Sequence, residues 1–440
     1  MEHIIETLEQ FKSLEKYLKE KVFIEPIQGN DKYHPVLTDL VGVYIKIYKG
    51  QEYFIPIEHS EGLNVPKDYV ISFLNKFEDL YCIDKKRALH LLGPIKVKDL
   101  KIIKTLAEEE DIEDRSYNKV LPIQDRDLIK DPDLNKIIPI GVLMDNINRE
   151  FLRYYRYLTE IPEEGFEYLN NRITPLFYLL ERNPIRIDTE KFIEYYNIED
   201  LNLNIKDNRV YTRYNIYNKT TRPTNSFNQV NFLAIPKTLQ ARSLYKPQND
   251  YFFEYDYDGY HLRLIGNEVG YKFTDQSAHK QLAQHILKRE EISEEEYSEI
   301  KQTNFQAIYG NIKKEYQDME FYKLLKGYIE STWEEFNKKG FIENKTTKVK
   351  IKKGKEEFTE TKLFNYMIQS IETSNNIEVL MQLLRIFKGK QSKIVLYTYD
   401  SVIIDAHIGD GKDFFNQVVE VMEQGNKFKI NRKVSKNLLF

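Results

Sequence analysis

The stretch "PQNDYFFEYDYDGYHLRLIG" (247–266) predicts an aromatic strand that runs into Asp256 and then into a turn and a helix. A carboxylate at the end of a buried strand either caps the next helix or binds a metal ion, and capping is the more common role. A second acid, Asp400, lies in "KIVLYTYDSVIIDA" (393–406), where two β-branched runs predict a hairpin with Asp400 at its tip. Aspartate is also an ordinary turn residue, so neither position decides a function by itself.

The stretch "IKQTNFQAIYGNIKK" (300–314) predicts a helix that ends at Gly310 and carries Lys301, Phe305 and Tyr309 on one face. One interpretation is an ordinary amphipathic helix, with the rings in the core and the lysine reaching water. The other is a nucleotide-binding surface, with the ammonium on the phosphates and the rings against base and sugar. Two strand-end aspartates flanking such a helix favour the second, because carboxylate oxygens hold Mg²⁺ and two ions can clamp the attacking and leaving oxygens of phosphoryl transfer.

Composition limits the class of protein. At 440 residues with 41% hydrophobic content, the chain is long enough for two or three globular domains. No apolar run approaches the length of a membrane span, and residues 1–21 predict a charged amphipathic helix rather than a signal peptide, so we expect a cytoplasmic protein, or one of the host cytoplasm if it is viral or plasmid-borne. The single cysteine, Cys82, excludes an internal disulfide and a cysteine-based zinc cluster. A net charge of −4 neither requires nor excludes nucleic acid.

Three regions are predicted along the chain. Residues 1–140 alternate helices and strands, with a β-hairpin at 41–59. The acidic and polar passage 107–127 breaks the periodicity and predicts a linker or loop. Residues 141–208 form a helical block, and residues 209–440 carry the acids and the helix described above.

The order and content of these segments resemble the polymerase module of family A DNA polymerases, the group that includes bacterial DNA polymerase I, from about residue 209 to the end. The segments that carry the resemblance are "TTRPTNSFNQVNFLAIPK" (220–237), "ARSLYKP" (241–247), "DYDGYHLR" (256–263, motif A), "KQTNFQAIYG" (301–310, motif B), "NYMIQS" (365–370) and "YTYDS" (397–401, motif C). Motif B is the most specific of these matches. The resemblance implies an α+β right-hand polymerase with palm, fingers (about 270–340) and a reduced thumb.

The resemblance also implies residue roles. Asp256 and Asp400 would hold two Mg²⁺ ions, with Mn²⁺ as an alternative and the carbonyl of Tyr257 as a further contact. The residues implied to bind the nucleotide are Tyr257, His261, His279, Lys301, Phe305 and Tyr309. The residues implied to touch primer-template DNA are Arg222, Asn365 and Gln369. The catalytic set is Asp256, Asp400 and Lys301.

Three departures from the family pattern bear on the substrate. The glutamate that crowds the ribose 2′-hydroxyl in the family is His261 here, which puts sugar discrimination in doubt. Tyr297 replaces a phosphate-binding arginine, and His279 would supply part of that role. Motif C has Tyr399 and Ser401 in place of histidine and glutamate, and an Asp-Ser pair also occurs in single-subunit RNA polymerases. A ribonucleotide-using enzyme therefore stays open as an interpretation.

Further differences lie upstream. Residues 173–192 resemble the helix that opens the family's polymerase region, yet only about thirty residues then precede the next matched strand. This spacing predicts a drastically shortened thumb, with either low intrinsic processivity or dependence on an accessory protein. Residues 1–140 weakly resemble the family's proofreading exonuclease domain, but "VFIEPI" (22–27) and "CIDKKRALHLLG" (82–93) lack its carboxylates. Without those ligands, two-metal hydrolysis has no site. We expect a degenerate exonuclease-like domain without proofreading; an unrelated α/β domain is the alternative.

The lysine-rich stretch "NKTTKVKIKKGKEEF" (344–358) predicts a β-hairpin that turns near Gly354. Charged strands protect sheet edges from aggregation, whereas the family's basic segment at this place favours contact of Lys350 and Lys352 with the DNA backbone.

The sequence thus predicts a template-directed DNA polymerase that extends a primer with dNTPs in DNA replication. A primase-like or ribonucleotide-using polymerase is the first alternative. A catalytically silent relative that binds DNA as a scaffold is the second, although the presence of both aspartates and the lysine argues against it.

Overall fold

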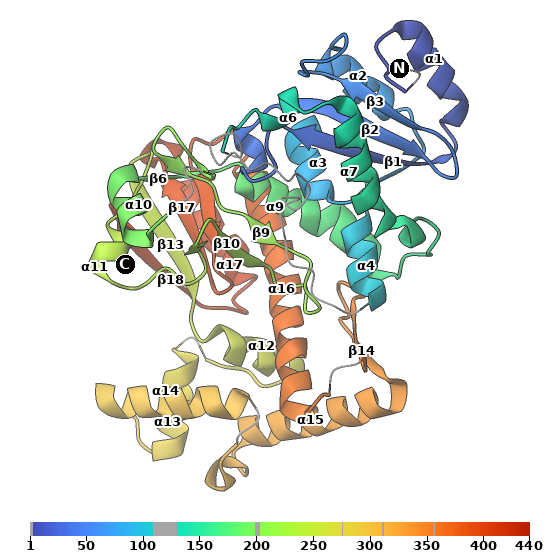
Figure 1. Ribbon diagram of the computed structural model, residues 1–440. Helices are drawn as coiled ribbons and strands as arrows, with labels where there is room; N and C mark the ends of the chain where they lie inside the picture. The colour runs from blue at the N-terminus through green and yellow to red at the C-terminus, as the bar shows by residue number, and fades with distance from the viewer. Residues whose placement is uncertain (1–2, 109–129, 199–202, 275, 310–311, 355–356) are drawn as a thin grey trace. The chain divides into compact units, whose positions relative to one another are not determined.

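The computed structural model describes residues 3–108, 130–198, 203–274, 276–309, 312–354 and 357–440. It consists of two compact units, an N-terminal unit of Met1–Tyr217 with Thr224–Asn231, and a C-terminal unit of Asn218–Pro223 with Phe232–Phe440 (Figure 1). Nearly all of the predicted linker at 107–127 lies outside the described residues, and so does Gly310, at which the motif B helix was expected to end.

A five-stranded mixed sheet in the order β3-β2-β1-β4-β5 forms the centre of the N-terminal unit. β2 pairs antiparallel with β1 and β3, and β4 pairs parallel with β1 and β5. The hairpin predicted at 41–59 is confirmed as β2 and β3, which turn at Lys49 in the left-handed region (φ 56°) followed by Gly50. Buried apolar side chains of the sheet and of α1, α2 and α3 form one core. These elements are β1 Lys21–Gln28, β2 Leu40–Ile47, β3 Glu52–Pro56, β4 Asp79–Cys82, β5 Lys98–Asp99, α1 Leu8–Leu14, α2 Lys67–Leu74 and α3 Lys85–Leu92.

Short helices and small sheets complete the N-terminal unit. β6, β8 and β7 pair antiparallel in that order, and so do β11, β10 and β9. Between Asp188 and Arg209, outside 199–202, the structure holds one helix of eight residues, α10. The elements are α4 Leu100–Glu108, α6 Leu134–Ile137, α7 Ile140–Leu152, α8 Gly165–Tyr168, α9 Thr174–Glu181, β6 Ile185–Ile187, α10 Thr189–Tyr196, β7 Ile205–Lys206, β8 Arg209–Val210, β9 Tyr214–Asn215, β10 Thr224–Phe227 and β11 Val230–Asn231.

An antiparallel sheet in the order β16-β17-β13-β18 lies at the centre of the C-terminal unit. Phe252 and Tyr255 of β13 are both buried, and because successive side chains of a strand point to opposite faces, they are buried on opposite faces of the sheet. The ring of Phe253 packs 4.8 Å from that of Phe415 in α17, so α17 covers one face of the sheet. The elements are β13 Tyr251–Tyr257, β16 Lys393–Tyr397, β17 Ser401–Ala406, β18 Ile430–Ser435, α17 Lys412–Glu423, α11 Leu239–Arg242 and β12 Tyr245–Lys246.

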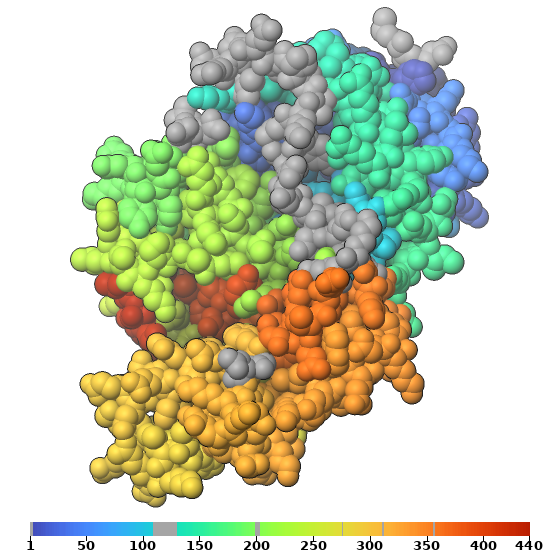
Figure 2. Space-filling view, turned by 60° about the horizontal axis from the view of Figure 1, so that its bottom comes forward, coloured from blue at the N-terminus to red at the C-terminus, as the bar shows by residue number. Residues whose placement is uncertain are grey.

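A group of helices follows β13 in the C-terminal unit and packs around the first half of α16. Its core holds Leu262, Leu282, Ala307, Phe321 and Phe364, one from each helix. Figure 2 shows α13, α14 and α15, coloured yellow to orange, as one continuous surface. The elements are α12 Tyr260–Val269, α13 Ala278–Leu287, α14 Glu294–Ile308, α15 Glu320–Lys339, β14 Phe341–Glu343, β15 Lys350–Lys352 and α16 Glu360–Ile386.

The basic hairpin turns earlier than its sequence suggested. β14 pairs with β15 from Phe341–Lys352 to Glu343–Lys350, so the turn lies at 344–349 and Gly354 follows the hairpin. The reason is the Asn344 side chain, whose Oδ1 accepts hydrogen bonds from the backbone N–H groups of Thr346 and Thr347 at 2.9 Å each and closes the turn locally. Within the described residues, no helix is both long and apolar enough to cross a membrane.

Candidate active site

The central sheet of the C-terminal unit brings Asp256 and Asp400 to one edge. Asp256, near the end of β13, lies opposite Ser401 in the antiparallel register, and Asp400 immediately precedes β17. The backbone N–H of Tyr257 donates to the carbonyl of Asp400 at 2.9 Å, which joins the two segments at this point. Both aspartates line one pocket of about 460 Å³, together with Lys237, Thr398 and other residues. The predicted hairpin with Asp400 at its tip is confirmed.

The two carboxylates share an unfavourable electrostatic environment. Burial, then the charges of Asp400 and Glu254, raise the pKa of Asp256 to about 7 against the opposing effect of Lys433 and Lys237. The pKa of Asp400 is raised as well, chiefly by burial. Divalent cations would remove this mutual repulsion, and carboxylate oxygens are the donors that Mg²⁺ and Mn²⁺ prefer. The donor set therefore fits such ions.

The tip of the hairpin is held by several contacts. Tyr399 adopts a left-handed backbone (φ 66°), which is unfavourable for a bulky side chain. The Asn376 side chain donates to the Tyr399 carbonyl at 2.7 Å and to the Tyr397 hydroxyl at 2.9 Å. The hydroxyls of Thr398 and Ser401 share a hydrogen bond of 2.7 Å across the turn. The surroundings therefore fix the backbone on both sides of Asp400.

The stripe of Lys301 and Phe305 on α14 with Tyr309 directly after the helix, the α14 stripe, is open to solvent at its first two residues, whereas Tyr309 packs partly against the core. Lys301 is exposed, Phe305 is 42% exposed and Tyr309 is partly exposed. The core side of α14 is formed instead by residues such as Asn304 and Ile308. The interpretation with both rings in the core is therefore wrong for Phe305, and an open surface of one cation and one ring remains, bordered by the partly buried Tyr309.

His279 of α13 lies beside this surface. Its ring centroid is 5.3 Å from that of Phe305. Burial, reinforced by the Lys301 charge, lowers the pKa of His279 to about 4, so the imidazole is neutral at pH 7. The Asn304 amide lies 3.4 Å from Nδ1 as a donor, which leaves the proton on Nε2. The Nε2–H group of His279 can therefore donate a hydrogen bond to a phosphate oxygen.

A buried carboxylate that sequence reasoning missed, Glu372 of α16, contacts two of the predicted residues. Its oxygens lie 2.9 Å from Nε of Arg222 and 3.0 Å from Nε2 of His261. Nδ1 of His261 lies 3.1 Å from the hydroxyl of Tyr309. The signal in the sequence that could have found it is that Glu372 is the one charged residue between Leu363 and Ile377.

The other predicted residues are positioned as follows. The Tyr257 ring is buried and stacks 4.1 Å from that of Tyr260, so its predicted metal contact rests on the main-chain carbonyl. Asn365 and Gln369 lie four residues apart on α16, on one partly exposed face. Within the described residues, the buried Oδ1 of Asn365 has no hydrogen-bond partner.

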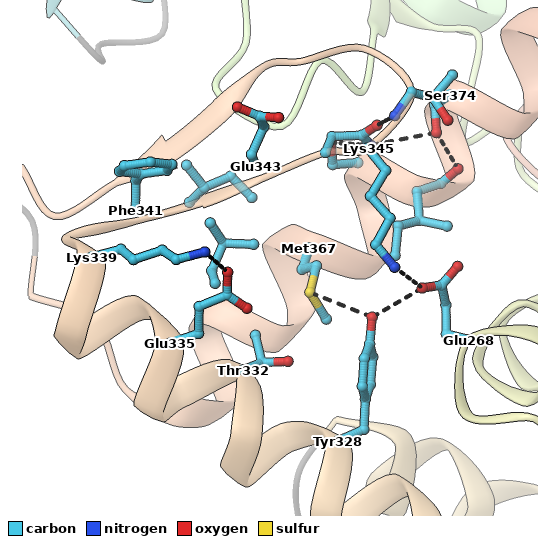
Figure 3. A pocket seen from close by; sticks show the side chains of 16 residues that line it. Glu268, Tyr328, Thr332, Glu335, Lys339, Phe341, Glu343, Lys345, Met367 and Ser374 are labelled. Atoms are coloured by element: carbon cyan, nitrogen blue, oxygen red, sulfur yellow. Dashed lines mark hydrogen bonds and ion pairs between the residues drawn. The ribbon is translucent and has the colours of Figure 1, made fainter.

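Lys350 and Lys352 lie in β15, outside the lining of the aspartate pocket. Their hairpin lines a second pocket of about 470 Å³ (Figure 3). There the Tyr328 hydroxyl donates to Glu268 at 3.1 Å and Lys339 pairs with Glu335 at 2.6 Å. The pocket's charged groups are thus largely paired with one another, and we assign no ligand to it.

The N-terminal unit holds a buried cluster of His34, His90 and Glu181 whose ligand-type atoms lie within 4.8 Å of one another. Nε2 of His90 is 2.9 Å from Glu181, and Nε2 of His34 is 3.1 Å from the Thr212 carbonyl. Lys86 places its ammonium 2.5 Å from the other Glu181 oxygen. Burial raises the pKa of Glu181, but Lys86, His90 and His34 together outweigh it, so the pKa is lowered. We interpret the cluster as a structural polar network, because a cation would have to displace that ammonium.

Ion pairs occupy the places where the sequence resembles an exonuclease. Arg87 of α3 lies 3.3 Å from Glu25 of β1 and 2.7 Å from Asp31. Lys101 lies 3.2 Å from Asp84, the side chain that caps α3. Basic side chains therefore already neutralise three of the acids of this region.

The comparisons with known proteins identify the fold. No protein-family model and no curated protein matches the sequence. Among solved structures, the chain is similar to the polymerase domain of Pol1 from M. smegmatis in complex with DNA primer-template and dNTP, with a TM-score of 0.70 and 13% identity over 99% of both chains. The chain therefore has the mixed α/β fold of a polymerase domain along its whole length, which confirms that part of the prediction. The exonuclease-like character of the N-terminal unit stays a prediction.

Proposed function

We propose that this chain is a template-directed DNA polymerase of a reduced family A type that extends a primer with dNTPs. The observation that carries the proposal is the shared pocket of Asp256 and Asp400 in a chain with a polymerase fold. The open α14 stripe supports it, because a nucleotide needs an accessible cation and ring surface rather than a buried one.

The proposed roles are those that the family resemblance implies. Asp256 and Asp400, with the Tyr257 carbonyl, would hold two Mg²⁺ ions. Bound divalent cations supply charge stabilisation to the attacking and leaving oxygens. Lys301 would bind the triphosphate, Phe305 would pack on the sugar and base, and catalysis would consist mainly of positioning and charge neutralisation.

Further contacts follow the same logic. His279 would donate a hydrogen bond to phosphate through Nε2, and His261 and Tyr309 would lie beside the nucleotide. Arg222, Asn365 and Gln369 would contact the primer-template.

We further propose that the N-terminal unit has no proofreading activity, since its sequence lacks the carboxylates of the exonuclease domain, and Arg87 and Lys101 pair with acids that are present. A primer with a mismatched 3′ end, incubated with Mg²⁺ and no dNTP, should keep its length. Shortening of that primer by the purified chain would contradict this part of the proposal.

Primer extension on a defined template tests the main proposal. Asp400→Asn removes one charge at constant size and should lower extension by at least about 10³-fold, the scale of transition-state charge stabilisation. Asp413→Ala, at an exposed aspartate of α17 in the same unit, is the matched control and should leave extension unchanged. Lys301→Ala should raise the KM for dNTP, whereas Lys314→Ala, at an exposed lysine beyond α14, should not.

The same assay separates the alternatives. Equal use of NTPs and dNTPs would favour the ribonucleotide-using enzyme. DNA binding without extension, whether Mg²⁺ or Mn²⁺ is supplied, would favour the silent scaffold and overturn the proposal.

A further inference from the structure

Glu372 lies in the middle of α16 and joins two groups of side chains that no single motif contains. Its side chain is 2% exposed, and its two oxygens contact Arg222 and His261 from different segments of the chain. A buried ion pair rarely adds stability over an apolar packing of the same volume, because desolvation offsets the attraction. The contacts of Glu372 with Arg222 and His261 are therefore better explained by the positions that they give these side chains than by added stability.

On one side, Glu372 fixes His261. A carboxylate accepts but does not donate, so Nε2 of His261 carries the proton that points to Glu372, at 3.0 Å. Nδ1 of His261 lies 3.1 Å from the Tyr309 hydroxyl, and the two rings stand at 90°. Each ring nitrogen of His261 therefore has a partner. The contact at Nδ1 also positions the ring of Tyr309, at the end of the open α14 stripe.

On the other side, Glu372 forms an ion pair with Arg222 in which Oε2 lies 2.9 Å from Nε without the alignment of a hydrogen bond. The guanidinium carbon lies 3.6 Å from the centre of the Tyr399 ring, directly before Asp400 in the chain. Glu372, His261 and Arg222 all contribute to the electrostatic environment of Asp400. One carboxylate thus connects the end of α14 with the hairpin that carries Asp400.

We infer that Glu372 is a positioning residue that couples nucleotide selection to binding of the primer-template. It acts through His261 and Tyr309 towards the incoming nucleotide, and through Arg222 and Tyr399 towards the hairpin of Asp400. The inference rests on the proposed polymerase function and adds a residue that determines sugar selection through the orientation of His261.

Glu372→Gln tests the inference, since it keeps the volume and one acceptor but removes the charge that Arg222 and His261 share. The expected result is a rise of at least tenfold in the KM for dNTP and a change of at least tenfold in the ratio of kcat/KM for dNTP to that for NTP. Glu378→Gln makes the same chemical change six residues further along α16 and is the matched control, expected to change neither.

A double-mutant cycle shows whether Glu372 acts through His261. If it does, His261→Gln combined with Glu372→Gln should change the sugar ratio little more than the stronger single variant does, because the second change removes an interaction already lost. If the effects of the two substitutions on the sugar ratio multiply in the double variant, the two residues act independently and the coupling is overturned.

The outcomes separate this inference from the proposed function. If the unaltered chain extends a primer but Glu372→Gln lowers only kcat and thermal stability, with KM and sugar ratio unchanged, Glu372 is structural and the inference is wrong. If the unaltered chain does not extend a primer at all, the proposed function is overturned, and the inference with it.

Discussion

The guanidinium carbon of Arg222 lies 3.6 Å from the centre of the Tyr399 ring, and Tyr399 holds a left-handed backbone conformation (φ 66°). A cation over an aromatic face is worth about 0.5–2 kcal/mol, depending on desolvation. Arg222 is 25% exposed at its side chain, so this contact is only partly desolvated. The pair explains why a strained tyrosine is tolerated at the tip of the Asp400 hairpin: its ring supports the arginine that we propose contacts DNA.

Two substitutions of Tyr399 distinguish the effect of its ring on DNA binding from the effect of its strained backbone. Tyr399→Phe keeps the stacking surface and should leave the Kd for primer-template unchanged within about twofold. Tyr399→Gly relieves the positive φ but removes the ring, and should weaken binding by about three- to tenfold, the smaller half of the cation–π range. Fluorescence anisotropy of a labelled primer-template measures both. Equal affinity of the Gly and Phe variants would show that the ring does not position Arg222 for DNA.

Burial of His279 predicts an acid-sensitive fold. The pKa of His279 is lowered to about 4 by burial and by Lys301. In the unfolded chain its pKa is about 6.5, so between these values the unfolded state binds a proton that the folded state does not. The free energy of unfolding should therefore fall as pH drops from 6.5 towards 4, by up to about 3 kcal/mol from this residue.

Urea unfolding at pH 7.5 and pH 5 measures this linkage. His34 and His90 also have lowered pKa values because of burial, so the comparison must be between variants. His279→Gln should lose part of the pH dependence. His285→Gln, at an exposed histidine on the same helix, should keep all of it. Identical pH dependence in the two variants would refute the neutral, buried state of His279.

Much of the site could be predicted from the sequence because its parts are local. The strand ending at Asp256, the hairpin tip at Asp400 and the four-residue spacing of the α14 stripe each follow from a short periodic pattern. Glu372 could not be predicted in this way, because its partners Arg222 and His261 are more than a hundred residues away in the sequence and its role depends on packing. The turn of the basic hairpin was misplaced for a similar reason, since one side chain, Asn344, decided between several turn-compatible positions.

The basic hairpin should contribute a salt-dependent part of DNA binding. Each phosphate contact made by a lysine changes the slope of log K against log salt by about 0.9 for duplex DNA. Lys350→Gln with Lys352→Gln should thus reduce the slope by up to about 1.8, without changing preference between template sequences. Lys323→Gln with Lys338→Gln, at two exposed lysines of α15, is the charge-matched control. A slope that falls equally in both double variants would mean that the effect is one of net charge and not of the hairpin.

The short connection after Asp188 predicts weak retention of DNA during synthesis. Among the described residues between Asp188 and Arg209, the chain has only the eight-residue helix α10. Eight residues of helix span about 12 Å, which is too short to wrap a duplex. Extension of a primer on a long single-stranded template, with excess unlabelled primer-template added as a trap at the start, measures the product length of a single encounter. We expect products of a few nucleotides to a few tens of nucleotides, with dissociation outpacing extension.

Removal of the trap should restore longer products through repeated binding, which would show that catalysis itself is intact. Kilobase products in the presence of the trap would mean that the chain retains DNA without an accessory protein. The prediction of weak DNA retention would then be wrong.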